Sequence, residues 1–259
     1  MKIGLIVFDL LSLILISCLW GTSIFLGFSL FQTYFSSVWF PVGFISSVLF
    51  GIMGLILMVG LVHRLLPKLH PGRYKVMKSP MFFFWIFRLI LKRALFAPVL
   101  KEILFQFTTL RFLALRALGA KIAFSSSMSS DVDILDPWFL EVGPGSTIGS
   151  GCFLSGHFMD KDDFILDRIQ IGSGSLLAAR VIVGPATRID DHCRILFGVN
   201  IGVHVHVEDR VTIGACSDIE GYATIASGVR MGTRTFLHKG VSLECDTKKR
   251  EEIFANTKN

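Results

Sequence analysis

One short segment of the chain holds most of the side chains that could carry out proton transfer. Residues 156–168 include His157 together with several aspartates, a lysine and an arginine. An imidazole changes its protonation state close to neutral pH, so His157 is suited to take a proton from a hydroxyl or an amine. Asp160, Asp162 or Asp163 could then orient its second ring nitrogen. The alternative is a structural histidine that only hydrogen-bonds the backbone of a turn.

A second group of candidate residues lies in segment 200–209. Asn200 opens this segment, and His204 and His206 follow it two positions apart. A zinc site is one interpretation of neighbouring histidines, but the chain contains no His-x₄-His pair, and histidines two apart are usually exposed to solvent. We therefore predict no metal ion, and no motif for nucleic-acid binding is visible.

The residues around these candidates follow a six-residue period. Thirteen aliphatic residues recur at this interval: Ile171, Leu177, Val183, Ile189, Ile195, Ile201, Val207, Ile213, Ile219, Ile225, Met231, Leu237 and Leu243. Glycine follows several of them (Gly172, Gly184, Gly202, Gly214 and Gly232), where we expect a turning backbone to favour a residue without Cβ. Three such units make one triangular coil, so residues 18 apart stack at the strand spacing of about 4.8 Å. The period predicts an all-β parallel β-helix over residues 119–246.

The period starts earlier in the chain and is broken twice. Its first members are Ile122, Met128, Ile134 and Leu140, and after a slip of two positions it continues at Val142, Ile148 and Leu154. From Leu154 to Ile171 there are 17 positions where 12 would keep the register, so we expect five extra residues to leave the coil as an inserted loop within 156–168. Long insertions in repeat proteins often carry function.

The first 66 residues are almost unbroken apolar sequence. Segments 3–31 and 38–62 each exceed the roughly 20 residues that an α-helix needs to cross a bilayer. We expect a transmembrane helical hairpin over residues 1–66, with an uncharged turn at 32–37. Lys and Arg follow the second segment but are absent from the turn, so the positive-inside rule places the β-helix in the cytoplasm.

Residues 67–118 are both basic and apolar. Before position 119 the chain has 12 Lys and Arg against 2 Asp and Glu, which favours a phospholipid surface over nucleic acid as the anionic partner. Arg88 and Lys92 share one helical face, so we expect interfacial helices at the inner leaflet. Ordinary helices packed on the β-helix are the alternative. Residues 247–259 form a polar tail that could cap the last coil.

The repeat resembles that of the left-handed β-helix acyltransferases. Three further elements, Leu118-Gly119-Ala120, Asp136-Pro137-Trp138-Phe139 and Gly156-His157-Phe158, look like the terminal domain of nonribosomal-peptide-synthetase-like membrane proteins. The resemblance covers about residues 118–245. It implies a left-handed parallel β-helix after the helical membrane region.

The resemblance also implies an activity and a set of ligand sites. The family transfers an acyl group from a thioester such as acyl-CoA, which acts as a co-substrate rather than a bound cofactor, and uses a histidine as general base; His157 matches that role. Family members are trimers with sites between subunits, so Asn200, His204 and His206 are expected to contact substrate. Arg230, Arg234 and Lys239 are expected near the CoA phosphates.

With the membrane hairpin, these features predict a trimeric acyltransferase in the bacterial inner membrane. Its acceptor would be an amphipathic envelope lipid or glycolipid. The alternative is a non-catalytic trimeric membrane scaffold that docks a biosynthetic partner.

Overall fold

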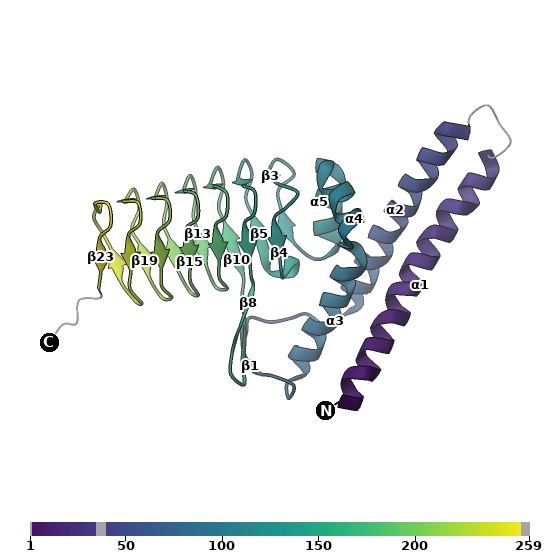
Figure 1. Cartoon of the computed structure of the whole chain (residues 1–259), viewed down its shortest axis with the longest axis horizontal. Coiled ribbons are helices and arrows are strands. Elements are labelled where there is room, and N and C mark those ends of the chain that lie inside the picture. Colours follow the sequence, from purple (N-terminus) through teal and green to yellow (C-terminus); the bar gives the residue numbers. More distant parts are fainter. Residues whose placement is uncertain (1, 35–39, 255–259) are drawn as a thin grey trace.

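A helical region precedes a parallel β-solenoid in the computed structural model, which describes residues 2–34 and 40–254 (Figure 1). The helices are α1 (Lys2–Tyr34), α2 (Phe40–Leu65), α3 (Pro80–Leu95), α4 (Pro98–Gln106) and α5 (Thr108–Ala117). The predicted turn at 32–37 lies partly outside the described residues. The predicted order of a helical region followed by a parallel β-helix is confirmed.

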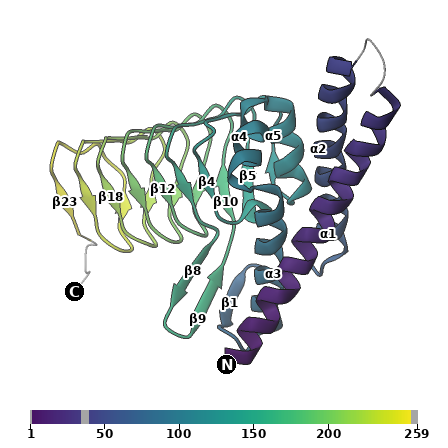
Figure 2. The same ribbon diagram turned by 45° about the vertical axis from the view of Figure 1, so that its right-hand side comes forward.

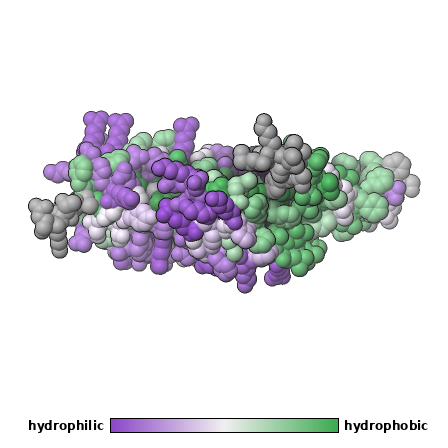
Figure 3. All heavy atoms as spheres, turned by 90° about the horizontal axis from the view of Figure 1, so that it is seen from below, coloured by the Kyte–Doolittle hydropathy of each residue, from purple (hydrophilic) through white to green (hydrophobic). Residues whose placement is uncertain are grey.

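Small residues allow α1 and α2 to pack closely as an antiparallel pair. The Ser23 hydroxyl donates a hydrogen bond to the carbonyl oxygen of Gly51 (2.6 Å), and a Cβ on Gly27 would lie 2.8 Å from the Ser47 carbonyl oxygen. The segments Leu10–Thr33 and Phe40–Leu65 have mean hydropathies of 2.0 and 2.5 and are long and apolar enough to cross a membrane. Figure 3 shows this apolar surface beside the more hydrophilic solenoid.

The solenoid has three flat faces, each a parallel sheet. Face 1 consists of β2 (Lys121–Ile122), β5 (Leu140–Val142), β10 (Ile169–Ile171), β13 (Arg188–Ile189), β16 (His206–Val207), β19 (Thr224–Ile225) and β22 (Ser242–Leu243). Face 2 consists of β3 (Ser127–Met128), β6 (Thr147–Ile148), β11 (Leu176–Leu177), β14 (Arg194–Ile195), β17 (Thr212–Ile213) and β20 (Arg230–Met231). Face 3 consists of β4 (Asp133–Ile134), β7 (Phe153–Leu154), β12 (Ile182–Val183), β15 (Asn200–Ile201), β18 (Asp218–Ile219), β21 (Phe236–Leu237) and β23 (Glu252–Ile253).

The six-residue period sets the core and the stacking of these coils. Each of the thirteen periodic aliphatic residues is at most 4% exposed, and residues 18 apart pair in register, as in Gln170 with Arg188 and Arg188 with His206. The reason for glycine after the periodic aliphatic residues differs from the turning backbone that we expected. A Cβ on Gly172 would lie 2.5 Å from the Asp190 carbonyl carbon, so close stacking of the next coil excludes a side chain there. Positive φ occurs two positions later, at residues such as His192.

The two breaks in the period build two local features. A 3₁₀ helix at Pro137–Phe139 accounts for the two-position slip, because Ile122 pairs with Val142. Val142 pairs with Ile171, 29 positions later instead of 18, so the insertion has eleven residues rather than the five expected. The expectation was wrong because Leu154 and Ile171 are consecutive inward positions, not positions two units apart.

The insertion is a β-hairpin rather than an irregular loop. Its strands β8 (His157–Asp160) and β9 (Asp163–Leu166) pair antiparallel, and β1 (Gly72–Lys75), from the segment after α2, adds a third strand beside β9. Figure 2 shows this sheet extending from the first coils alongside α3. Phe164 is fully buried between the hairpin and α3, where its ring lies 4.6 Å from that of Trp85.

Cations from the helices cap the open end of the solenoid. In the later coils the carbonyl groups of Ser175, Leu177 and Val181 accept hydrogen bonds from the preceding coil. The equivalent carbonyl groups of the first coil, at Ser126, Met128 and Val132, have no preceding coil. Arg111 donates to the first two of these oxygens (3.2 and 2.9 Å) and Lys101 donates to the third (3.0 Å). The helices therefore satisfy backbone groups that would otherwise lie buried without partners.

Arg88 and Lys92 lie within the protein rather than at a lipid surface, which corrects the role expected for them. Arg88 is 4% exposed, contacts the His63 ring and donates to the Pro67 carbonyl oxygen (2.7 Å). Lys92 donates to the Leu135 carbonyl oxygen (3.2 Å). Burial lowers the pKa of Arg88 to about 10 and also lowers the pKa of Lys92. Contact of this region with lipid remains a prediction for its exposed apolar residues, including Phe83, Val99 and Phe107.

The polar tail begins as a cap on the last coil. Strand β23 adds to face 3, and the Asp246 carboxylate accepts a hydrogen bond from the Arg230 backbone N–H (2.8 Å). Residues 255–259 lie outside the described residues.

Candidate functional site

The two breaks in the period meet at a buried pair of side chains. Nδ1 of His157, at the start of the hairpin, lies 2.6 Å from Oδ2 of Asp136, which precedes the 3₁₀ helix. The Asp136 side chain is fully buried, whereas His157 keeps 18% of its side chain exposed. Nε2 of His157 has no hydrogen-bond partner among the described residues.

Local backbone features bring this pair together. Gly156 lies directly against the 3₁₀ turn, and a Cβ there would be 3.0 Å from Cβ of Phe139 and 3.1 Å from Cβ of Asp136. A side chain at position 156 would require these neighbours to shift by a few tenths of an ångström, so glycine avoids crowding where the hairpin leaves the coil beside the carboxylate. The Asp-Pro and Gly-His elements noted in the sequence are therefore in contact in space.

The second carboxylate oxygen of Asp136 also accepts a hydrogen bond. The Trp85 indole N–H, from α3, donates to Oδ1 at 2.6 Å. The Trp85 ring also lies edge-on to the His157 ring, with centroids 4.7 Å apart. A carboxylate with one partner on each oxygen has a fixed orientation, and it favours the tautomer of His157 that carries its proton on Nδ1. This arrangement leaves the lone pair of Nε2 free to accept a proton.

The hairpin aspartates do not contact His157, which corrects the partner expected from the sequence. Asp160 and Asp163 pair across the hairpin near its tip, and Asp162 lies in the turn between the strands. The Asp163 carboxylate instead binds Lys75 (2.6 Å) and Arg73 (3.2 Å) of β1. The hydrogen bond from Lys75, with the nearby charge of Arg73, lowers the pKa of Asp163. These contacts hold the hairpin to β1.

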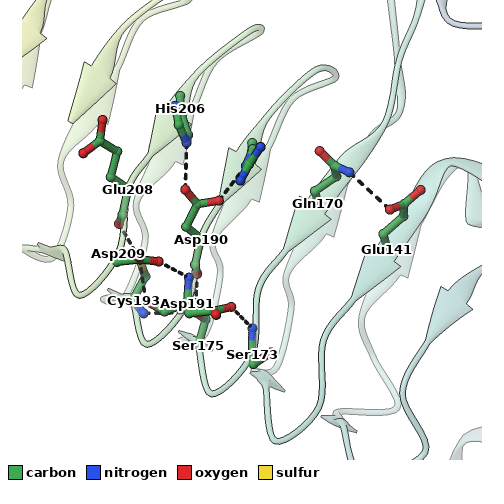
Figure 4. Close-up of polar contacts among 11 residues, drawn as sticks. Glu141, Gln170, Ser173, Ser175, Asp190, Asp191, Cys193, His206, Glu208 and Asp209 are labelled. Carbon is green, nitrogen blue, oxygen red and sulfur yellow. Dashed lines mark hydrogen bonds and ion pairs between the residues drawn. The ribbon is translucent and has the colours of Figure 1, made fainter. Parts of the chain in front are cut away.

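A second histidine–aspartate pair lies on face 1. Nε2 of His206 is 2.9 Å from Oδ2 of Asp190 (Figure 4). Nε of Arg188 lies 2.6 Å from Oδ1 of the same carboxylate. Burial alone would raise the pKa of Asp190, but the hydrogen bonds from Arg188 and His206 lower it. The side chains of His206 and Arg188 are 39% and 60% exposed, so the pair lies at an open surface.

The acids beside this pair stabilise the stacking of the coils. The Asp191 carboxylate accepts a hydrogen bond from the Ser173 N–H (2.5 Å), and the Asp209 carboxylate accepts one from the Asp191 N–H (2.9 Å) (Figure 4). Among the side chains that the structure describes, no group of three or more His, Cys, Asp or Glu could hold a metal ion.

The remaining predicted ligand residues are spread around the solenoid. His204 stacks on Tyr222 at 4.9 Å, and the Lys239 ammonium lies 5.3 Å from the Tyr222 ring centre, so these three lie together at one corner. Asn200 donates to Asp218 on face 3 (2.6 Å), whereas Arg230 lies on face 2. The structure therefore brings His204 and Lys239 together but leaves Asn200, His206 and Arg230 on three different faces.

Three clefts on the outer surface of the solenoid could receive a ligand. Two clefts of about 440 and 420 Å³ adjoin on face 1 and share Gln170 and Arg188; Asp190 lines the first and His204 the second. The third cleft, of about 710 Å³, is lined by Arg234, Lys249 and Arg250. Of the three basic residues expected near the CoA phosphates, Arg234 lines this cleft, whereas Arg230 and Lys239 do not.

Sequence reasoning missed Asp136 and Trp85. Asp136 carried a usable signal, because it lies at the two-position slip, and such a slip marks backbone that leaves the regular coil. Trp85 carried no such signal. Its contact with Asp136 spans 51 positions and depends on how α3 docks against the first coils.

No protein-family model matches the chain, and neither does any curated protein sequence. The narrower resemblance to the nonribosomal-peptide-synthetase-like terminal domain thus stays a prediction.

Several solved structures are similar to the solenoid. A putative acetyltransferase of Bacillus cereus matches at 20% identity with a TM-score of 0.42, over 50% of this chain and 71% of its own. A variant of AntD, an N-acyltransferase of Bacillus cereus in complex with dTDP and coenzyme A, matches at 20% identity with a TM-score of 0.41, over 51% and 80%. The acetyltransferase domain of PglB from Neisseria gonorrhoeae, in complex with acetyl coenzyme A, matches at 21% identity with a TM-score of 0.32, over 56% and 61%. At these identities and TM-scores, the chemistry of this chain must be argued from its own residues.

Proposed function

We propose that this protein is a membrane-anchored acyltransferase that uses His157 as its general base. The observation that carries the proposal is the His157–Asp136 pair, in which a buried carboxylate orients a partly exposed imidazole whose Nε2 has no hydrogen-bond partner among the described residues. A positioned general base of this kind typically accelerates a reaction by about 10²–10⁴-fold.

The donor in this proposal is a thioester such as acyl-CoA. Nε2 of His157 takes the proton of an acceptor hydroxyl or amine, whose oxygen or nitrogen forms a bond to the thioester carbonyl carbon. The carbon–sulfur bond then breaks, and the leaving thiolate takes the proton from His157. The solved acyltransferases that resemble the solenoid include complexes with coenzyme A.

The acceptor in this proposal is an amphipathic lipid or glycolipid of the bacterial envelope. Helix α3 carries Trp85 beside His157, and its Ala94 carbonyl oxygen accepts a hydrogen bond from Trp20 of α1 (2.9 Å). One helix therefore contacts both the pair and a candidate membrane span. With α1 and α2 in the inner membrane and Lys and Arg after α2 on the cytoplasmic side, His157 would lie where cytoplasmic acyl-CoA and membrane lipids meet. We propose a homotrimer, as in the family that the repeat resembles.

Mass spectrometry of envelope lipids and glycans tests this function. Cells that lack the protein, carry it, or carry His157→Ala would be compared. We expect a species with an added acyl mass only in cells with the intact protein. If no species differs, or if His157→Ala matches the intact protein, the acyltransferase proposal is wrong.

A non-catalytic scaffold is the second candidate, and one observation favours it. Phe158 and Met159, adjacent residues on β8, are 46% and 45% exposed, and neighbouring exposed apolar side chains suit docking of a partner protein. Under this alternative, removal of the hairpin abolishes function, whereas His157→Ala has no effect.

A further inference from the structure

We propose that Trp85 is a positioning residue for the His157–Asp136 pair, so that the helical region completes the site on the solenoid. This inference rests on the proposed function. Its basis is the hydrogen bond from the Trp85 indole to Asp136 Oδ1, together with the contact of the Trp85 and His157 rings.

The burial of Asp136 makes this hydrogen bond important. The carboxylate is fully enclosed, and its hydrogen bonds come from two side chains, Trp85 on Oδ1 and His157 on Oδ2. A buried carboxylate that loses one donor can rotate or relax, because the cost of leaving an oxygen unpartnered is high in a low-dielectric environment. Rotation of Asp136 would release the His157 ring from the orientation that exposes Nε2.

Packing around Trp85 also limits its own movement. Its ring lies 4.6 Å from Phe164 of the hairpin and 5.8 Å from Phe82 of the same helix. These rings and Leu166 form a small apolar cluster apart from the main core. The indole N–H is thus held toward Asp136 by contacts from both α3 and the hairpin.

Helix α3 is fixed on several sides. Trp20 of α1 donates a hydrogen bond to the Ala94 carbonyl oxygen of α3. Arg88 contacts His63 in the last turn of α2 and the Pro67 carbonyl oxygen just after that helix. Lys92 donates to the carbonyl oxygen of Leu135, which precedes Asp136. A displacement of α1 or α2 would therefore reach Asp136 through one rigid element. The solenoid without its helices would lack the donor to Oδ1.

A matched pair of tryptophan variants tests this role. Trp85→Phe removes an indole N–H that is hydrogen-bonded, whereas Trp138→Phe removes a buried indole N–H that has no partner among the described residues. Both changes remove similar ring area from the same part of the molecule. The full chain in detergent would be assayed with radiolabelled acetyl-CoA and a total lipid extract of the host cells. Melting temperatures of both variants provide the folding control.

We expect Trp85→Phe to lower kcat about tenfold while KM for acetyl-CoA stays within about twofold, because orientation of the base affects the chemical step rather than donor binding. Trp138→Phe should match the intact protein. If the two variants have equal kcat while His157→Ala is inactive, Trp85 has no positioning role and the proposed function still stands. If His157→Ala keeps full activity, the proposed function fails and the role of Trp85 fails with it.

An NMR measurement tests the same hydrogen bond without activity. In the full chain labelled with ¹⁵N-tryptophan, the Trp85 indole resonance should shift in Asp136→Asn, because its acceptor changes from a carboxylate to an amide. The Trp138 resonance should move less. An unchanged Trp85 resonance would mean that the indole does not donate to Asp136, and would overturn the inference whether or not the protein transfers acyl groups.

Discussion

The irregular first coils and the regular later coils each contain a histidine–aspartate pair, but in different surroundings. His157 and Asp136 lie at the two breaks in the period, where the carboxylate is fully buried and a helix from outside the solenoid donates to it. His206 and Asp190 lie on successive rungs of an unbroken face, where solvent reaches the pair and Arg188 shares the carboxylate. A regular coil presents its outward side chains on an open face. Enclosure of a polar pair requires backbone that leaves the repeat.

The largest difference that we expect between the two histidine–aspartate pairs is in their contribution to activity. His157→Ala should reduce formation of the acylated product by about 10²–10⁴-fold, the usual contribution of a general base. His206→Ala should leave product formation within about twofold, because its pair lies in an open surface environment. Lipid mass spectrometry of cells that carry each variant measures both. Equal losses would mean that the enclosed pair has no special role.

The next largest difference that we expect is between Asp136 and Asp190, in the free energy of unfolding that each contributes. Asp136→Ala leaves the Trp85 indole N–H without its partner, so we expect a loss of about 1–3 kcal/mol in the free energy of unfolding. Asp190→Ala breaks contacts to side chains that solvent already reaches, so its loss should stay below about 1 kcal/mol. Urea unfolding of the purified full chain gives both values. A larger loss for Asp190→Ala would contradict the assignment of burial as the decisive difference.

A third comparison is between Arg111, which caps the first coil, and an exposed arginine on a later coil, in their contribution to the free energy of unfolding. Arg111→Met leaves the carbonyl groups of Ser126 and Met128 without a donor, and we expect a loss of roughly 1–3 kcal/mol. Arg194, exposed on face 2, is the matched control, and Arg194→Met should change stability by less than about 0.5 kcal/mol. The same unfolding experiment applies. Similar values for the two variants would show that the helices do not cap the solenoid through Arg111.

The smallest effect that we expect is a pH dependence of the stabilisation by Asp190. The folded state lowers the pKa of Asp190 below its usual value, near 4 for an aspartate. Asp190 therefore stabilises the fold above that value, and the contribution disappears as the pH falls through its lowered pKa. We expect Asp190→Asn to have a lower Tm than the intact protein at pH 7 and a smaller difference near pH 3. A difference that grows in acid would contradict the direction of the shift.

The regular part of the molecule was predictable from the sequence because one residue type at one spacing determines it. Ile189 and Ile195 face inward for the same reason as Ile213, so counting by six identifies the core. The hairpin was predictable as an insertion but not in length, because the period does not tell which two inward positions flank it. Asp160, Asp162 and Asp163 were expected beside His157 because they are near it in sequence, yet the strands of a hairpin carry its tip away from its base.

The contacts of the helical region were the least predictable. Amphipathic helices rich in aromatic and basic residues suit a lipid surface, but the same pattern also suits a solenoid end that exposes carbonyl groups. Lys92, Lys101 and Arg111 take the second role, whereas Arg88 binds His63 and Pro67 before the solenoid begins. The sequence contains no signal that distinguishes these roles from contact with lipid. The hydrogen bond from Trp85 to Asp136 could not be predicted either, because it forms only when α3 packs against the first coils.

Transfer of label by the purified full chain shows directly whether His157 acts as the general base. Radiolabelled acetyl-CoA and a total lipid extract of the host cells would be incubated with the intact protein, His157→Ala, Asp136→Asn and His206→Ala. We expect label in the lipid fraction with the intact protein and with His206→Ala, and a loss of at least about 10²-fold with the other two variants. Equal labelling by the intact protein and His157→Ala would contradict this role of His157.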